Sequence, residues 1–316
     1  VPAQQIGAAM ESLDQPMAAD LAGPAPPGYN YPQFTGSVFL DDLRRTVRGG
    51  PQPGERAPDF ELPTTEGQRV RLSALRGQPV LLIFGSVTDP MARGGLPSLK
   101  QLYADGGGGI ARWFHVYVRE AHPGASFPAP KTESEKMEHA RAFKALEEIP
   151  WPVLVDDLDG TVHRAYGGLP NAAYLIDADG LIAFKDQWAS AATLRVALDS
   201  LLEHEGRAAP VAGGMERTMH LLGPMAYGWS AIQRAGEPAT RDLWRAIPPL
   251  ALLLWLGRFL RPALAPLVDR GRPLPTAAKM AAALAVAGGG WLLLRGRVSS
   301  EEKKEADQAK AAMQQR

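Results

Sequence analysis

The chain contains no cysteine among its 316 residues. This absence excludes disulfides, thiolate metal sites, iron–sulfur clusters and any thiol-based redox step that the chain would perform alone. The chain also lacks an excess of either charge, since lysine plus arginine and aspartate plus glutamate each number 34. A zero balance disfavours nucleic acid as the main partner. Apolar residues make up 45% of the chain, so we expect a globular protein rather than wholesale disorder.

The neutral total conceals two parts of opposite charge. Residues 1–206 carry 18 basic and 26 acidic side chains, whereas residues 207–316 carry 16 basic and 8 acidic ones. Such opposed parts indicate that each faces different surroundings. A basic second part is what an anionic lipid surface attracts.

The first part divides into an arm and a domain. Residues 1–53 are rich in proline and aromatic residues and predict an extended arm, with a short helix over 37–47, that covers a partner or the chain's own domain. Residues 54–206 alternate apolar runs with helical patterns and predict an α/β sandwich. The expected strands are 68–72, 80–85, 113–118, 153–155, 173–177 and 181–185, and the expected helices are 96–103, 134–148 and 189–205.

The second part holds the two most apolar windows of the sequence, residues 247–260 and 277–294. A full membrane span needs ~20 apolar residues. The two windows could therefore form one membrane span, a membrane hairpin or a re-entrant anchor. The alternative is a helical appendage buried on the domain. The predicted organisation is a linker at 207–245 that could be interfacial, one or two membrane helices at 246–295 and a polar tail at 296–316.

Interfacial tryptophans and small residues at helical spacing carry the membrane prediction. Tryptophans favour the membrane–water interface, and small residues let membrane helices approach one another closely. The candidate anchor residues are Trp244, Leu252, Trp255, Ala281, Ala285, Gly289 and Trp291.

Several motifs resemble a known family. The segments FGSVTDP at 84–90, LYAD at 102–105 and WFHVYVREAHP at 113–123 are similar to the iodothyronine deiodinase family, within the peroxiredoxin-like (AhpC/TSA) branch of the thioredoxin superfamily. The resemblance covers about residues 56–205. It implies a thioredoxin-like sandwich, to which the extended arm and the C-terminal membrane segments are added. It also implies a cis peptide bond before Pro170, which stands where the superfamily has its cis-proline loop.

The same resemblance implies that the reactive atoms are missing. The family's selenium or sulfur nucleophile corresponds to Asp89 and its preceding cysteine to Val87, whereas Glu120 and His122 are retained. A carboxylate has no accessible redox cycle, and an isopropyl group has no reactive atom. We therefore expect the deiodinase or peroxidase reaction to be lost, and we expect no catalytic residue, cofactor or metal.

The position of Asp89 suggests the N-cap of a helix, where the helix dipole would keep its carboxylate ionised. His122 is interpreted as an imidazole at a strand end with its hydrogen bonds satisfied. The alternative groups Asp89, Glu120 and His122 as a hydrolytic or metal-binding cluster.

An intact scaffold without its nucleophile predicts an accessory subunit that binds and stabilises other subunits of a bacterial membrane complex, such as an electron-transfer or photosynthetic one. The expected partners are those subunits and the lipid bilayer, and not nucleic acid. Two alternatives are an enzyme of altered chemistry and a thiol-redox or maturation accessory that acts on a partner's cysteines. Because no apolar stretch precedes the arm and Val1 suits a GTG start codon, we expect the domain on the cytoplasmic face of the inner membrane.

Overall fold

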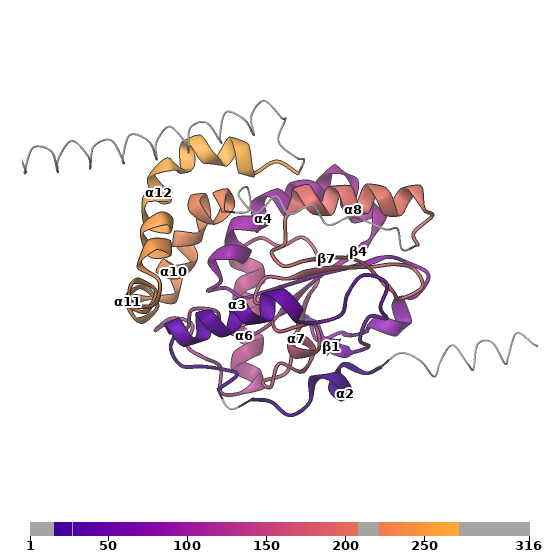
Figure 1. Ribbon diagram of the computed structural model, residues 1–316, viewed down its shortest axis with the longest axis horizontal. Helices are drawn as coiled ribbons and strands as arrows, with labels where there is room; N and C mark the ends of the chain where they lie inside the picture. Colours follow the sequence, from indigo (N-terminus) through magenta and orange to yellow (C-terminus); the bar gives the residue numbers. More distant parts are fainter. Residues whose placement is uncertain (1–15, 27, 208–220, 272–316) are drawn as a thin grey trace, which may run out of the picture. The chain divides into compact units, whose positions relative to one another are not determined.

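A five-stranded mixed sheet forms the centre of the protein (Figure 1). The structure is a computed structural model that describes residues 16–26, 28–207 and 221–271. In the strand order β5-β4-β3-β6-β7, the first three strands are parallel to one another, β6 is antiparallel to β3, and β7 is antiparallel to β6. Their bounds are β3 Val80–Gly85, β4 Arg112–Tyr117, β5 Val153–Val155, β6 Ala173–Ile176 and β7 Ile182–Asp186, and a separate hairpin pairs β1 Glu61–Pro63 with β2 Arg69–Arg71.

Both faces of the sheet are covered, which explains why β3 is apolar at every position. Leu81 and Ile83 of β3 point to one core, and Leu82 and Phe84 point to the other. The first core is completed by α4 (Pro90–Leu102), α6 (Glu133–Leu146) and α8 (Ala191–Glu203), and the second by η1 (Leu72–Leu75) and α7 (Thr161–Ala165). Two short turns, η2 (Tyr103–Gly107) and α5 (Gly108–Ile110), connect α4 to β4.

This architecture confirms the predicted α/β sandwich. The predicted strands, and the helices at 134–148 and 189–205, agree with the observed elements to within two residues at each end. The helix predicted over 96–103 is the second half of α4, which already begins at Pro90 because Asp89 caps it.

The N-terminal arm lies on the chain's own domain. It contains two helices, α2 (Ala18–Ala22) and α3 (Gly36–Arg48), so it is less extended than the sequence predicts. The helix expected over 37–47 is observed as α3. Between the two helices, aromatic side chains are buried, and α2 contacts α7.

In the described residues that follow the domain, the helical elements include η3 (Pro224–Gly228), α10 (Trp229–Ala235), α11 (Glu237–Ala246) and α12 (Pro248–Val268). They share a third core with the N-terminal arm. Its buried members are Tyr31, Phe34, Trp229, Ile232, Leu243, Ala251 and Leu254. The arm and the C-terminal helices are therefore packed together.

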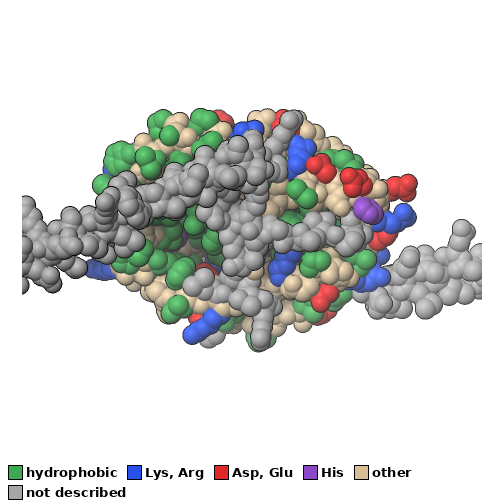
Figure 2. Space-filling model, turned by 45° about the horizontal axis from the view of Figure 1, so that its top comes forward, with side chains coloured by type: hydrophobic (Ala, Val, Ile, Leu, Met, Phe, Trp, Pro, Cys, Tyr) green, Lys and Arg blue, Asp and Glu red, His purple; other side chains and the backbone are tan. Residues whose placement is uncertain are grey.

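Helix α12 is, within the described ranges, the one helix long and apolar enough to cross a membrane. Its large apolar side chains are exposed on one side, and Figure 2 shows hydrophobic side chains gathered at the end of the molecule where Figure 1 places α11 and α12. Of the candidate anchor residues, Trp244 lies on α11, and Leu252 and Trp255 lie on α12. Ala281, Ala285, Gly289 and Trp291 lie outside the described residues, so a second membrane helix stays a prediction.

Candidate functional site

The turn between β3 and α4 is held by two hydroxyl side chains. The Ser86 hydroxyl accepts the backbone N–H of Ala121 at 3.2 Å, and the Thr88 hydroxyl accepts that of His122 at 3.1 Å. Both acceptors lie in the FGSVTDP motif and both donors in the EAHP motif. These bonds connect the two motifs in the fold, since the side chains of one fix the backbone of the other.

Asp89 is the N-cap of α4, as predicted. Its carboxylate accepts the backbone N–H of Met91 at 2.8 Å, and the side chain is 2% exposed. Burial raises the pKa of Asp89 to about 7, against the opposing effect of the Met91 and Ala92 amides. The carboxylates of Asp42 and Glu120 raise it further. The expectation that Asp89 stays ionised is therefore wrong, because desolvation exceeds the stabilisation that a helix N-terminus gives.

Glu120 serves the turn rather than the cavity. Its carboxylate accepts hydrogen bonds from the hydroxyls of Thr88, at 2.7 Å, and Tyr117, and it lies 3.1 Å from Nδ1 of His139. The side chain is buried and does not line the cavity beside Asp89. The predicted alternative of a three-residue cluster is thus reduced to two residues, Asp89 and His122, which line the same cavity.

We expect Glu120→Gln to lower the free energy of unfolding by about 1–3 kcal/mol, because one of its buried donors loses its acceptor. Urea denaturation followed by tryptophan fluorescence measures this change. Glu138→Gln, on the exposed side of α6, is the matched control and should leave the stability unchanged. Equal effects of the two substitutions would show that the Glu120 network does not stabilise the turn.

His122 is buried without the hydrogen bonds that the sequence predicted for it. Its Nδ1 has no partner among the described residues, and its ring centroid lies 4.1 Å from that of Phe34. Burial lowers the pKa of His122 to about 3, so the ring is neutral at pH 7. The prediction of a hydrogen-bonded imidazole is wrong for Nδ1, because Phe34 of the arm covers the ring and the sequence does not show this contact.

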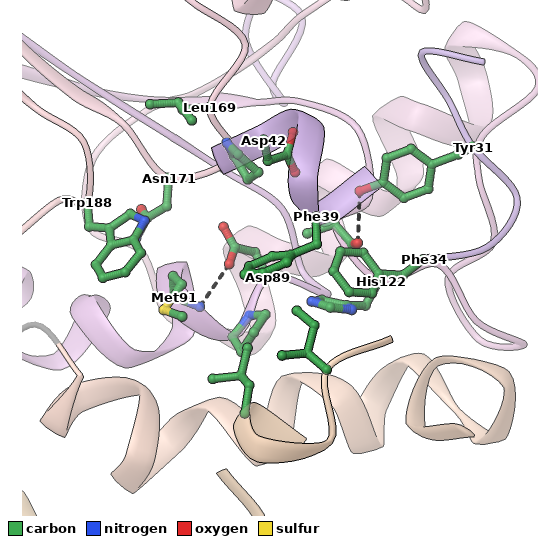
Figure 3. A pocket seen from close by; sticks show the side chains of 15 residues that line it. Tyr31, Phe34, Phe39, Asp42, Asp89, Met91, His122, Leu169, Asn171 and Trp188 are labelled. Carbon is green, nitrogen blue, oxygen red and sulfur yellow. Dashed lines mark hydrogen bonds between the residues drawn. The ribbon is translucent and has the colours of Figure 1, made fainter. Parts of the chain in front are cut away.

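A cavity of about 100 Å³ opens beside Asp89 (Figure 3). Three buried polar atoms of residues that line it make no hydrogen bond within the described part of the chain, and they are Asp89 Oδ2, His122 Nδ1 and Asn171 Oδ1. The walls are mostly apolar. The arm supplies Tyr31 and Phe34, the domain supplies Leu169 and Trp188, and the C-terminal helices supply Ile247 and Leu250.

Arg119 fastens the arm over this cavity. The guanidinium lies 2.9 Å from the Asp42 carboxylate and donates to the backbone carbonyl of Tyr29 at 3.3 Å. It also lies 5.2 Å from the ring centroid of Tyr29 and 4.9 Å from that of Tyr31. The Tyr31 hydroxyl donates to the carbonyl of Ala121 at 2.9 Å. The sequence patterns did not single out Tyr31 and Phe34, which line the cavity, or Arg119, which holds the arm.

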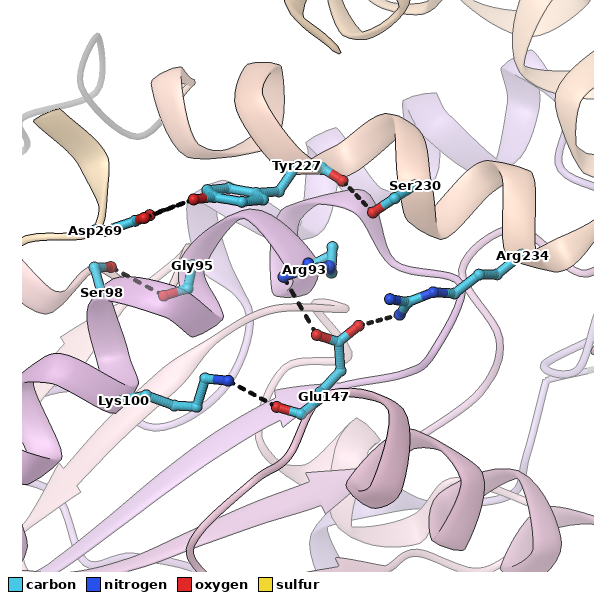
Figure 4. Close-up of polar contacts among 9 residues, drawn as sticks. All are labelled: Arg93, Gly95, Ser98, Lys100, Glu147, Tyr227, Ser230, Arg234 and Asp269. Carbon is cyan, nitrogen blue, oxygen red and sulfur yellow. Dashed lines mark hydrogen bonds and ion pairs between the residues drawn. The ribbon is translucent and has the colours of Figure 1, made fainter. Parts of the chain in front are cut away.

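The C-terminal helices that complete the cavity are held by a second polar cluster (Figure 4). The buried Glu147 carboxylate, just after α6, pairs with Arg93 of α4 at 3.3 Å and with Arg234 of α10. The Tyr227 hydroxyl of η3 donates to the Asp269 carboxylate, 2.6 Å away, beyond the end of α12. The ion pair therefore holds α10 on the domain, and the hydrogen bond holds the end of α12 on η3.

Close backbone packing also holds α12 in place. A Cβ added to Gly257 would lie 2.2 Å from the carbonyl oxygen of Met225, so the two backbones would have to separate. We expect Gly257→Ala to destabilise the protein by about 1–3 kcal/mol in urea denaturation. Gly109→Ala is the control, since its added Cβ meets nothing within 4 Å. If Gly257→Ala proved as stable as the control, α12 would not pack as described.

Two predicted site positions remain, Val87 and Pro170. Val87 is 1% exposed and belongs to the hydrophobic core, so its position takes no part in the cavity. The peptide bond before Pro170 is trans, so the predicted cis bond is wrong. Gly167 and Gly168, with φ of 95° and 71°, reverse the chain just before it, and the loop reaches the cavity without a cis bond.

The chemistry open to this arrangement is limited. At neutral pH the carboxyl of Asp89 is about half protonated and His122 is neutral, so the cavity can bind a small polar molecule through hydrogen bonds. Among the described residues, no group of three histidine, aspartate or glutamate side chains is placed to hold a metal ion. The chain has no thiol for exchange or peroxide reduction.

Comparisons with known proteins agree with this fold. Residues 53–185 match the AhpC/TSA family model. The chain is 33% identical over 138 residues to thyroxine 5-deiodinase of Gallus gallus, a match that covers 40% of this chain and 53% of that protein. It is 28% identical over 137 residues to thioredoxin-like protein YneN of Bacillus subtilis, covering 42% and 70%. The chain thus spans about half the length of the deiodinase.

Solved structures include similar chains. Peroxidoxin BcpB of Mycobacterium tuberculosis has 22% identity and a TM-score of 0.37, covering 48% of this chain and 97% of that one. The thioredoxin domain of a thiol-disulfide oxidoreductase of Bacteroides vulgatus has 18% identity and a TM-score of 0.37, covering 50% and 100%. Residues 53–185 thus match the AhpC/TSA family model and have a thioredoxin-like fold, in a chain that has no cysteine.

Proposed function

We propose that this chain is a non-catalytic accessory subunit that binds and stabilises other subunits of a bacterial membrane complex, of the electron-transfer or photosynthetic type. The observation that carries the proposal is that Asp89, at the family's nucleophile position, is buried and covered. Asp89 is 2% exposed, and both the arm and the C-terminal helices lie over it. Loss of the thiol removes the family's chemistry, while the scaffold around it is kept and covered.

The C-terminal helices support the membrane part of the proposal. Helix α12 is long and apolar enough to cross a membrane, and most of its residues are not buried. The sequence continues into a second apolar window at 277–294 and a basic excess beyond residue 206. We place the protein at the inner membrane, with the thioredoxin-like domain on the cytoplasmic face.

Extraction of membranes in a mild detergent tests this proposal. We expect the chain, captured through a C-terminal tag, to co-purify at fixed stoichiometry with other membrane subunits, as measured by mass spectrometry of the intact particle. Recovery of the chain as a soluble monomer without detergent would overturn both the membrane and the subunit parts. If deletion of the chain instead changed the redox state of cysteines in the co-purified partners, that result would favour the alternative function of a thiol-redox accessory.

A second candidate, an enzyme of altered chemistry, is favoured by one observation. Asp89 and His122 line the same cavity, and each has a polar atom without a partner among the described residues. An activity or a bound ligand that Asp89→Asn abolishes would support this candidate. Under the accessory proposal, the substitution leaves co-purification unchanged.

A further inference from the structure

Helix α12 has two opposite faces. Ala251, Leu254 and Gly257 are buried, with Gly257 against the backbone of η3. At about 100° per residue, the exposed large side chains fall in a single stripe on the other side of the helix. Their exposed fractions range from 37% to 61%, and they are Leu252, Leu256, Phe259, Leu260 and Leu267.

The charges of α12 are of one sign. Residues 248–268 contain no aspartate or glutamate and two arginines, Arg258 and Arg261. The Arg258 guanidinium lies 5.1 Å from the ring centroid of Trp255 and 4.4 Å from that of Phe259. Arg261 lies toward η3 instead, with its guanidinium 4.7 Å from the ring centroid of Tyr227. A long basic side chain such as that of Arg258, beside an apolar stripe, can reach phosphate groups while its stem lies on apolar surface. This pattern complements an anionic lipid surface.

The buried face argues against an upright span. Its buried residues lie in the first half of α12, from Ala251 to Gly257, and at the other end the Tyr227 hydroxyl of η3 donates to Asp269, just beyond the helix. Element η3, on which this face packs, also contacts α4, and α4 carries Arg93 in its ion pair with Glu147. A helix that crossed the bilayer in this packing would draw η3 and these charged groups toward the hydrocarbon, where ionised side chains are costly.

We propose that α12 lies in the plane of the membrane interface, with the Leu252–Leu267 stripe in the acyl-chain region and the thioredoxin-like domain on its other side. This inference rests on the proposed membrane attachment and specifies its geometry. An in-plane helix keeps one face on protein and one in lipid along its whole length. It also explains how a mostly apolar helix of 21 residues can have one face packed on the rest of the protein without being a core helix.

Because the chain has no cysteine, single-cysteine variants carry a spin label without background. Labels at positions 252, 256, 260 and 267 of the full chain are measured on vesicles of equal parts phosphatidylcholine and phosphatidylglycerol. We expect all four to have the same depth, roughly 5–10 Å into the interface, from their accessibility to oxygen and to a polar nickel chelate. A label at Leu202, an exposed leucine of α8, should stay in water.

Three results would overturn the proposal. A depth that changes steadily from position 252 to 267 would show a spanning helix and leave membrane attachment intact. Labels that stay in water on vesicles would refute the attachment too. Labels shielded from both reagents without vesicles would show that the stripe pairs with a second copy.

Vesicle partitioning gives an independent measure of the stripe. Leu256→Glu should weaken binding at least about tenfold, because burial of one leucine is lost and a charge is added. Leu202→Glu is the matched control, as its side chain is 56% exposed and lies outside the stripe. Equal binding of the two variants would contradict the proposal.

Discussion

Replacing Asp89 by asparagine should stabilise the protein at pH 8 by about 2–4 kcal/mol more than it does at pH 4. The folded chain holds the pKa of Asp89 at about 7, whereas the unfolded chain holds it near 3.9. The folded state therefore binds the proton more tightly. Stability arising from this carboxyl is fully present below about pH 4 and is lost as the pH rises through about 7. Asparagine stays neutral and can still accept the Met91 amide.

Urea denaturation of both proteins at pH 4 and pH 8 measures the effect. Asp156 also has a raised pKa, of about 6, but it titrates in both proteins and cancels in the difference. If Asp89→Asn changed the free energy of unfolding by the same amount at pH 4 and at pH 8, solvent would have to reach Asp89 in the folded chain. The covered site would then be refuted.

Arg119→Met should cost about 2–4 kcal/mol of stability, the second largest effect that we expect. Breaking a buried ion pair leaves an uncompensated charge, and here the partner Asp42 is 16% exposed, which moderates the loss. The arm also loses its bond to the Tyr29 carbonyl and the contacts with two tyrosine rings. Because the arm covers the cavity, its release should lower the pKa of Asp89 toward 4.

Equilibrium unfolding and the pH dependence of stability test this prediction together. Arg44→Met is the control, since Arg44 pairs with Asp41 of α3 at 3.0 Å but is 78% exposed. An exposed pair of this kind contributes at most about 1 kcal/mol. An Arg119 variant as stable as the Arg44 variant would show that the arm does not depend on this contact.

The sequence predicts the domain well because its signals are local. A continuous apolar run such as residues 80–85 indicates a strand buried on both faces wherever it occurs, and Asp89 followed by Pro90 indicates a helix start. The motifs add the thioredoxin-like fold through the family resemblance. These features need no information about distant parts of the chain.

The environment of the site depends on distant segments, and there the sequence was insufficient. The pKa of Asp89 is raised because distant side chains help to bury it, Phe34 from 55 positions earlier and Leu250 from 161 positions later. Arg119 lies within the WFHVYVREAHP motif, but the resemblance implies no role for it, and the sequence does not show that its side chain contacts Asp42 and the tyrosines of the arm. The proline-rich aromatic arm was the available clue, and it left open whether the arm covers a partner or the domain.

The absence of catalysis is tested most directly by a turnover assay. The purified chain, supplied with a dithiol reductant, is given a hydroperoxide or an iodinated phenol, in parallel with its Asp89→Asn variant. We predict that neither protein converts either substrate faster than buffer. Turnover by the unaltered chain that Asp89→Asn abolishes would show that the carboxylate has taken over a catalytic role, and it would contradict the account.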